Sequence, residues 1–155
     1  MAIVHLIDAL LTEIDTGLRT LAAATPATRP SPAADLVAEP LSASDQTAGA
    51  ALMRVNHAGE VAAQALYRGQ AFTTRDPGIR QSLLDAARDE QDHLAWCQQR
   101  ISELGGRTRL LGPLWYAGSF ALGATAGLFS QSTGLGFLVE TERQVEEHLT
   151  GHLDR

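Results

Sequence analysis

The chain of 155 residues has a mass of 16.5 kDa, with 45% hydrophobic and 19% charged residues, the length and balance of one globular domain. Its 12 basic residues are all arginine and stand against 18 acidic ones, so the net charge of -6 disfavours a nucleic-acid partner. Cys97 is the only cysteine, which excludes an intrachain disulfide and makes a cysteine-based zinc site implausible. Any bound metal is therefore expected on carboxylates and imidazoles.

Residues 1–24 are predicted to form an amphipathic helix, because aliphatic residues recur at spacings of three and four from Ile3 to Leu21. No cationic flank precedes this apolar row, so the segment resembles neither a secretory signal nor a mitochondrial presequence. We therefore expect the protein to stay in the compartment where it is made, in the simplest case a bacterial cytoplasm. Residues 25–41 contain four of the six prolines, which predicts a linker.

Residues 42–155 are predicted to be all-α, since no alternation of apolar and polar residues indicates a strand. Ser42 is typical of a helix N-cap, and Asp76 followed by Pro77 starts a second helix in the same way. The predicted helices cover residues 42–72, 77–104, 114–129 and 134–155.

The third of these helices lies in a stretch without any charge, from residue 110 to residue 139. Its 16 residues span about 24 Å, less than a hydrocarbon core of ~30 Å, so a transmembrane helix is the weaker interpretation. Glycines and alanines give it a smooth face that lets another backbone or a flat ligand approach. A buried core helix and a helix that also touches lipid or an apolar substrate both remain open.

Carboxylates interrupt the apolar rows of two predicted helices. Glu90 occupies a core position in the second helix, and Glu142 occupies one in the fourth. Glu60, among small and apolar residues of the first, is a weaker third case. An ionised carboxylate that is buried alone is costly, so inward acids need protons, arginine partners or cations. A metal ion is the simplest answer.

Glu90 and His93 have the ligand spacing Glu-x-x-His, which places both side chains on one helix face about 60° apart. A ferritin-like carboxylate site takes one Glu from each of two helices and a Glu-x-x-His from each of two others. The chain supplies Glu60, Glu90 with His93, and Glu142, but no second Glu-x-x-His. Because no Gly or Pro ends the final helix, we expect the domain to continue past Arg155.

Four segments carry the motifs of a known family. They read LMRVNHAGEVAAQALYRGQA (52–71), DEQDHLAWCQQRISELGGR (89–107), LLGPLWYAGSFALGATAGL (110–128) and GFLVETERQVEEHLTGHLDR (136–155). In this order and spacing they resemble the bacterial demethoxyubiquinone hydroxylases of ubiquinone biosynthesis. The HAGE and EQ-x-H segments are the specific ones, and the first 40 residues carry little of the resemblance.

The resemblance implies a ferritin-like helical bundle and a di-iron monooxygenase that hydroxylates a demethoxyubiquinol, with two Fe ions and O2 as co-substrate. It implies that Glu60, Glu90, His93 and Glu142 are metal ligands, and that the second Glu-x-x-His lies beyond Arg155. The implied partners are a polyprenylated quinol and the membrane that holds it, with the protein peripheral on the cytoplasmic face of a bacterial cell membrane. Other ubiquinone-biosynthesis proteins or a second copy of the chain are further candidate partners.

Several further residues are candidates for the site with less support from the sequence. His148 matches a family position near the site and is expected beside the ligands. Tyr116, Gly123 and Gly127 are expected along the path of the substrate, although core packing also accounts for the tyrosine. Glu140 lies off the apolar row, so Glu142 is favoured over it, and His57 is interpreted as a hydrogen-bonding core histidine.

Two other function classes remain open from the sequence. A ferritin-like binding or storage module would hold iron without inserting oxygen, and it would not need the uncharged stretch. A membrane-surface interaction protein would use that stretch and the first helix, but its inward glutamates would have no purpose.

Overall fold

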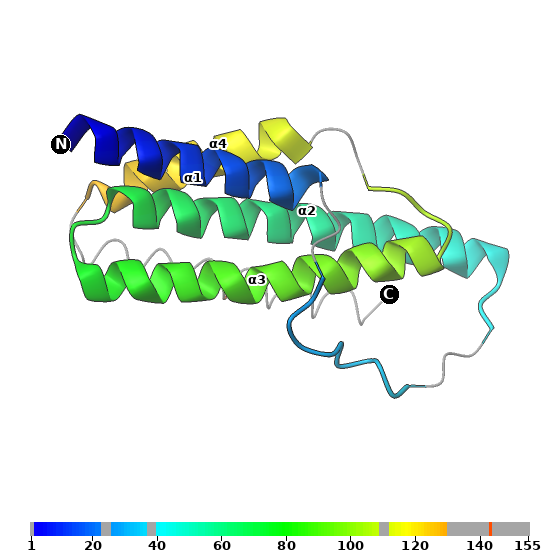
Figure 1. Cartoon of the computed structure of the whole chain (residues 1–155). Coiled ribbons are helices and arrows are strands. Elements are labelled where there is room, and N and C mark those ends of the chain that lie inside the picture. Colours follow the sequence, from blue (N-terminus) through cyan, green and yellow to red (C-terminus); the bar gives the residue numbers. More distant parts are fainter. Residues whose placement is uncertain (1, 23–25, 37–39, 109–111, 130–142, 144–155) are drawn as a thin grey trace.

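A computed structural model of the chain describes residues 2–22, 26–36, 40–108, 112–129 and 143 (Figure 1). The described residues form four helices and no strand, as predicted. The helices are α1 (Ala2–Ala22), α2 (Ala43–Thr73), α3 (Pro77–Glu103) and α4 (Gly112–Gly127). The predicted helix over 134–155, with Glu142 and His148, lies outside the described residues.

The helix ends follow from the capping residues. Ser42 Oγ accepts a hydrogen bond from the Asp45 N–H at 3.2 Å, and Asp76 Oδ1 accepts from the N–H of Gly78 at 2.8 Å. Gly105 adopts φ +70°, the left-handed conformation that ends α3. The boundaries of α4 differ from the prediction by two residues at each end. The helix begins earlier because its first turn tolerates Pro113. It ends earlier because the N–H groups of residues 128 and 129 bond to carbonyls three residues before them, in a final 3₁₀-type turn.

The central helix is α2, which lies between α3 on one side and the α1 and α4 pair on the other (Figure 1). A short connection makes α3 antiparallel to α2. Trp115 donates to the Ala58 carbonyl, and Gly127 lies against Gln70, so α4 runs parallel to α2 in a constant register. Each side of α2 therefore meets a different neighbour.

Two clusters of small and aliphatic side chains form the core. The first joins α2 and α3 around Tyr67, which is 1% exposed, and contains Ala63, Leu66, Tyr67, Ala71, Leu83 and Ala87. The second joins α2, α3 and α4 and contains Val61, Ala65, Leu94 and Tyr116. Burial of each large side chain contributes about 1.5–3 kcal/mol, so these clusters hold the three helices together.

Glycines bring the backbones of α2 and α4 into contact. A Cβ atom at Gly123 would collide with the carbonyl oxygen of Leu66, and one at Gly127 would collide with that of Gln70. Gly69 of α2 faces the α4 backbone in the same way. Only glycine permits this approach, so Gly123 and Gly127 face protein backbone in the described structure.

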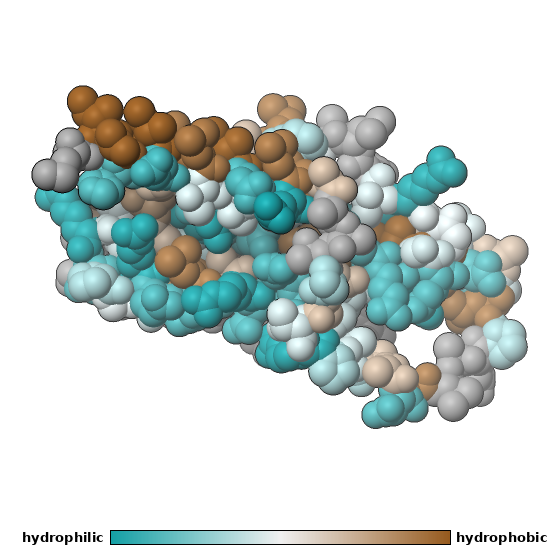
Figure 2. Space-filling model, in the orientation of Figure 1, coloured by the Kyte–Doolittle hydropathy of each residue, from teal (hydrophilic) through white to brown (hydrophobic). Residues whose placement is uncertain are grey.

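The outermost helix, α1, meets the bundle along the face that carries Glu13, Gly17 and Thr20, and it turns most of its aliphatic side chains to the surface. Glu13 and Thr20 face α2, where they contact Arg68 and Gln64, and the buried Gly17 lies over Tyr116. The aliphatic side chains on the other side are 47–74% exposed and form a continuous apolar strip (Figure 2): Ile3, Leu6, Ile7, Leu10, Leu11, Ile14 and Leu18. A surface helix normally buries such a face against its own domain, whereas this face of α1 is exposed.

None of the described helices combines enough length with enough apolar character to span a lipid bilayer.

Candidate metal centre

Glu60, Glu90 and His93 meet where the middle of α2 packs against α3. One ligand atom from each residue lies within 4.8 Å of the other two. His93 Nδ1 is 3.1 Å from Glu90 Oε2 and 3.8 Å from Glu60 Oε2. Glu60 of α2 therefore converges with Glu90 and His93, which share one face of α3.

Both carboxylates of this cluster are shielded from water. The side chains of Glu60 and Glu90 are 11% and 16% exposed, whereas that of His93 is 43% exposed. The aliphatic neighbours along the helices, Val61 and Leu94, are buried. Two acids in such a place repel each other and lose hydration, so they require a positive partner.

The protonation of the cluster shows how the metal-free protein balances this charge. The two carboxylates raise the pKa of His93 to about 10, so the imidazole is protonated at neutral pH. Burial raises the pKa of Glu90 to about 7, and the charge of Glu60 adds to the rise. Burial also acts to raise the pKa of Glu60, but contacts with His93 and Glu90 outweigh it and lower that pKa. Protons therefore take the place that a cation would fill.

The donor set fits a hard transition metal. Carboxylate oxygens with few nitrogen ligands suit iron and leave coordination positions open. Among the described residues, His93 is the only cationic side chain that contacts the two glutamates. Burial, with the charge of Glu60 adding to it, raises the pKa of the Cys97 thiol to about 12, and this thiol is not part of the cluster among the described residues.

Comparison with known proteins identifies the family. The model of the family described as ubiquinone biosynthesis protein COQ7 matches residues 47–155. The chain belongs to the COQ7 family. This is a ferritin-like helical family, so the predicted fold class and the resemblance are both confirmed.

Curated relatives in the COQ7 family are similar along almost the whole chain. A protein of Ralstonia pickettii is 53% identical over 160 residues, which cover 96% of this chain and 74% of the relative. One of Nitrosomonas europaea is 55% identical over 149 residues, covering 96% and 72%, and one of Dechloromonas aromatica is 56% identical over 146 residues, covering 94% and 70%. Each is named 3-demethoxyubiquinol 3-hydroxylase. No solved structure matches the chain.

The other candidate site residues from the sequence lie outside the described residues or are not part of the cluster. The roles of Glu142 and His148 stay predictions, because both residues lie outside the described part of the chain. His57 is half-buried, and its Nε2 has no hydrogen-bond partner among the described residues. The predicted substrate path along Tyr116, Gly123 and Gly127 is untested, and the packing of α4 on α2 and of α1 on α4 already accounts for these residues.

Sequence reasoning missed two buried polar residues beside the cluster. Gln64, 3% exposed, accepts from Thr20 Oγ1 at 2.6 Å and donates to the Ala87 carbonyl at 3.4 Å. Asp92, 2% exposed, accepts hydrogen bonds from Thr28 and Arg29 of the linker. Their hydrogen-bond partners are distant in sequence and could not be predicted from it. The available signal was position, because Gln64 lies four residues after Glu60 and Asp92 directly precedes His93.

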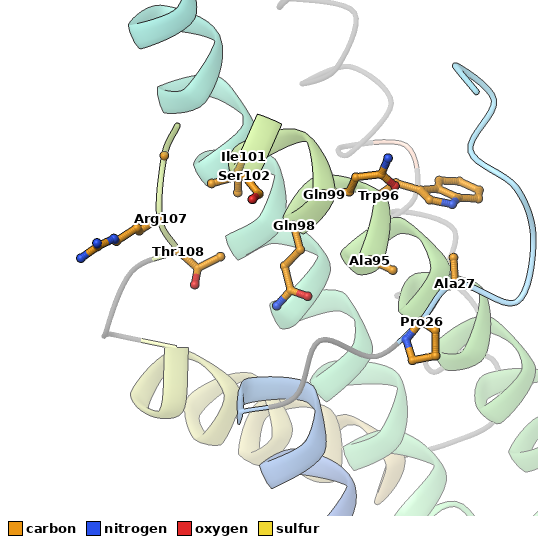
Figure 3. A pocket seen from close by; sticks show the side chains of 11 residues that line it. Pro26, Ala27, Ala95, Trp96, Gln98, Gln99, Ile101, Ser102, Arg107 and Thr108 are labelled. Carbon is orange, nitrogen blue, oxygen red and sulfur yellow. The ribbon is translucent and has the colours of Figure 1, made fainter. Parts of the chain in front are cut away.

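An open groove of about 670 Å³ lies between the linker and α3 (Figure 3). Pro26, Trp96, Gln98 and Arg107 are among its lining residues. The described lining contains none of the three cluster residues, so the groove is separate from the candidate metal centre.

Proposed function

We propose that this chain is a 3-demethoxyubiquinol 3-hydroxylase that uses two iron ions and O2. The cluster of Glu60, Glu90 and His93 carries the metal part of the proposal, because among the described residues it sets two shielded carboxylates against one imidazole. Membership of the COQ7 family and the names of the relatives support the substrate and the reaction.

Glu60, Glu90 and His93 would hold iron in this proposal, with Glu142 as a further ligand that the resemblance implies. Iron would supply the activation of dioxygen for insertion of one oxygen atom into the quinol ring. His93 must give up the proton that its neighbours hold on it, and Glu90 must be ionised, before either binds a metal. The buried residues around them keep water away from the carboxylates and fix their direction.

The apolar strip of α1 supports a membrane-surface location for this chemistry. A polyprenylated quinol resides in the bilayer, and an exposed row of aliphatic side chains on an outer helix is suited to lie in the membrane interface. The exposed Leu114 and Trp115 add apolar surface at the start of α4. The proposed location is the cytoplasmic face of a bacterial cell membrane, with the protein peripheral.

Iron content tests the metal assignment. A domain that also carries the second Glu-x-x-His should bind about two iron ions, whereas the same domain with Glu90→Ala should bind none. Glu103→Ala is the matched control, because Glu103 is a half-exposed acid on the same helix that pairs with Arg100. Iron retained by Glu90→Ala would show that the ligand assignment is wrong.

The same measurement separates the alternatives. Many ions per complete domain would favour a storage module, and no iron in the complete wild-type domain would favour an interaction protein. An iron-loaded chain that fails to hydroxylate a short-tailed demethoxyubiquinol, given a reductant and O2, would contradict the proposed activity while leaving the metal centre intact.

Vesicle flotation tests the membrane surface. Because the net charge of -6 opposes anionic lipid, binding should occur on neutral phosphatidylcholine vesicles. Ile7→Asp combined with Leu11→Asp should weaken binding by about a hundredfold, since each aliphatic side chain contributes about 1.5 kcal/mol or more on burial. Thr12→Asp, on an exposed polar position of α1, is the control. Unchanged binding of the double variant would exclude α1 as the docking helix.

A further inference from the structure

A buried carboxylate ties the proline-rich linker to α3 directly beside the cluster. The carboxylate of Asp92 accepts from the Thr28 N–H at 2.6 Å and from Thr28 Oγ1 at 3.0 and 2.9 Å. It also accepts from Arg29 Nε at 2.7 Å. Asp92 is 2% exposed and precedes His93. This carboxylate therefore has a full set of partners and no spare capacity for a ligand.

The linker contacts Trp96 through the same arginine. Trp96 Nε1 donates to the Arg29 carbonyl at 3.3 Å, and the Arg29 guanidinium carbon lies 5.9 Å from the centre of the Trp96 ring. Figure 3 shows the Trp96 side chain directed toward the linker. The position of this ring on α3 thus depends on the segment that Asp92 holds.

Trp96 in turn contacts the imidazole of the cluster. The ring centres of His93 and Trp96 are 5.3 Å apart at an angle of 42°. The His93 side chain is 43% exposed, so protein surrounds it only in part. The two glutamates contact it on one side, and Trp96 provides a further contact. A metal ligand needs this restraint, because its affinity depends on side chains that hold it in the binding orientation.

We propose that Asp92 is a positioning residue of the metal centre. By holding Thr28 and Arg29, it keeps Trp96 against the His93 imidazole, and this contact holds Nδ1 toward Glu60 and Glu90. The proposal rests on the assignment of His93 as a ligand. It gives the linker a role in the site, although the linker supplies no ligand among its described residues.

Asp92→Asn tests this role, with Asp89→Asn as a matched control. Asp89 pairs with the same Arg29 at 3.0 Å, but its side chain is 65% exposed. In the metal-free full chain, NMR should detect the nuclear Overhauser contact between the His93 and Trp96 rings in the wild type and the control, and should show its loss in Asp92→Asn. Titration with Co²⁺ alone should give an affinity about tenfold weaker for Asp92→Asn and unchanged within about twofold for Asp89→Asn.

A second variant covers the case in which Asp92→Asn does not fold. Trp96→Leu leaves the Asp92 hydrogen bonds in place and removes the ring, so it should weaken Co²⁺ binding by a similar factor while the helical circular dichroism is unchanged. Wild-type affinity for Co²⁺ in Trp96→Leu, or a retained ring contact and affinity in a folded Asp92→Asn, would overturn the proposal and leave Asp92 as an anchor of the linker only. If the wild-type chain binds no Co²⁺, the metal centre itself fails, and the NMR comparison still decides whether Asp92 positions His93.

Discussion

Two buried carboxylate sites lie on different sides of α2, one under α1 and one against α3. Under α1, Glu13 receives two parallel hydrogen bonds from Arg68, at 2.7 and 3.0 Å, and both side chains are less than one-fifth exposed. Against α3, Glu60 and Glu90 share a single imidazole, at 3.8 and 3.1 Å. The first site is neutral by itself, whereas the second needs bound protons to approach neutrality.

This difference shows how a buried acid that serves structure can be told from one that serves chemistry. A guanidinium fork occupies both oxygens of a carboxylate and is always charged, so Glu13 and Arg68 form a closed pair that anchors α1. An imidazole is smaller and gives up its proton, so a metal ion can replace that proton between Glu60 and Glu90. The partner, more than the burial, indicates the role.

The largest expected effect comes from breaking the contact between α4 and α2, because α2 carries residues of both sites. Gly123→Leu places a side chain where the Leu66 carbonyl lies, so α4 must separate from α2. We expect a loss of at least about 4 kcal/mol in the free energy of unfolding, measured by urea denaturation. If Gly123 only lined the substrate path, as expected from the sequence, this substitution would impair turnover and spare iron. The structure indicates instead that iron content falls together with the fold.

Gly118→Leu is the control for this prediction, because a Cβ atom at Gly118 meets nothing within 4 Å and the residue is exposed. Its stability should equal or exceed that of the wild type, since leucine favours a helix over glycine by up to ~1 kcal/mol. A Gly123→Leu protein with wild-type stability and impaired turnover would restore the substrate-path interpretation.

The second prediction breaks the closed pair. Arg68→Ala leaves Glu13 buried without its partner, which should lower the free energy of unfolding by about 3 kcal/mol. The rest of the bundle does not depend on this pair, so hydrogen exchange should accelerate in α1 while α3 keeps its protection. Arg19→Ala, which removes a largely exposed pair with Asp15, should leave both measurements unchanged. Equal effects of the two substitutions would show that the buried pair does not anchor α1.

The contrast between α1 and α3 also shows how far the sequence can predict this molecule. The apolar row of α3 correctly placed Glu90 inward, because helical periodicity reports which residues share a face, and the Glu-x-x-His spacing then added His93. For α1, the same periodicity identified two faces but not which one meets protein. The face that carries Glu13 and Thr20 is the inner one because these two residues find partners on α2, and those partners are set by tertiary structure.

Contacts between distant segments set a second limit on prediction. The apolar row of α3 does not predict that Asp92 is buried. Its partners Thr28 and Arg29 are 64 and 63 positions away, in a linker whose prolines predict no fixed contact with α3. Glu60 is the weakest of the three candidate ligands in the sequence, because its position 3.8 Å from His93 depends on how α2 packs against α3.

The smallest expected effect concerns the pH dependence of metal binding to Glu60, Glu90 and His93. Between pH 8 and 9, His93, with a pKa of about 10, is protonated and Glu90, with a pKa of about 7, is mostly ionised. Each bound ion then displaces one proton, so Co²⁺ affinity should rise about tenfold per pH unit, or about 1.4 kcal/mol. Below pH 7 both groups must release a proton, and the dependence should steepen toward a hundredfold per unit. Calorimetry in buffers of different ionisation enthalpy counts these protons directly. An affinity for Co²⁺ that stays constant from pH 6 to 9 would mean that protons do not occupy the place of the metal.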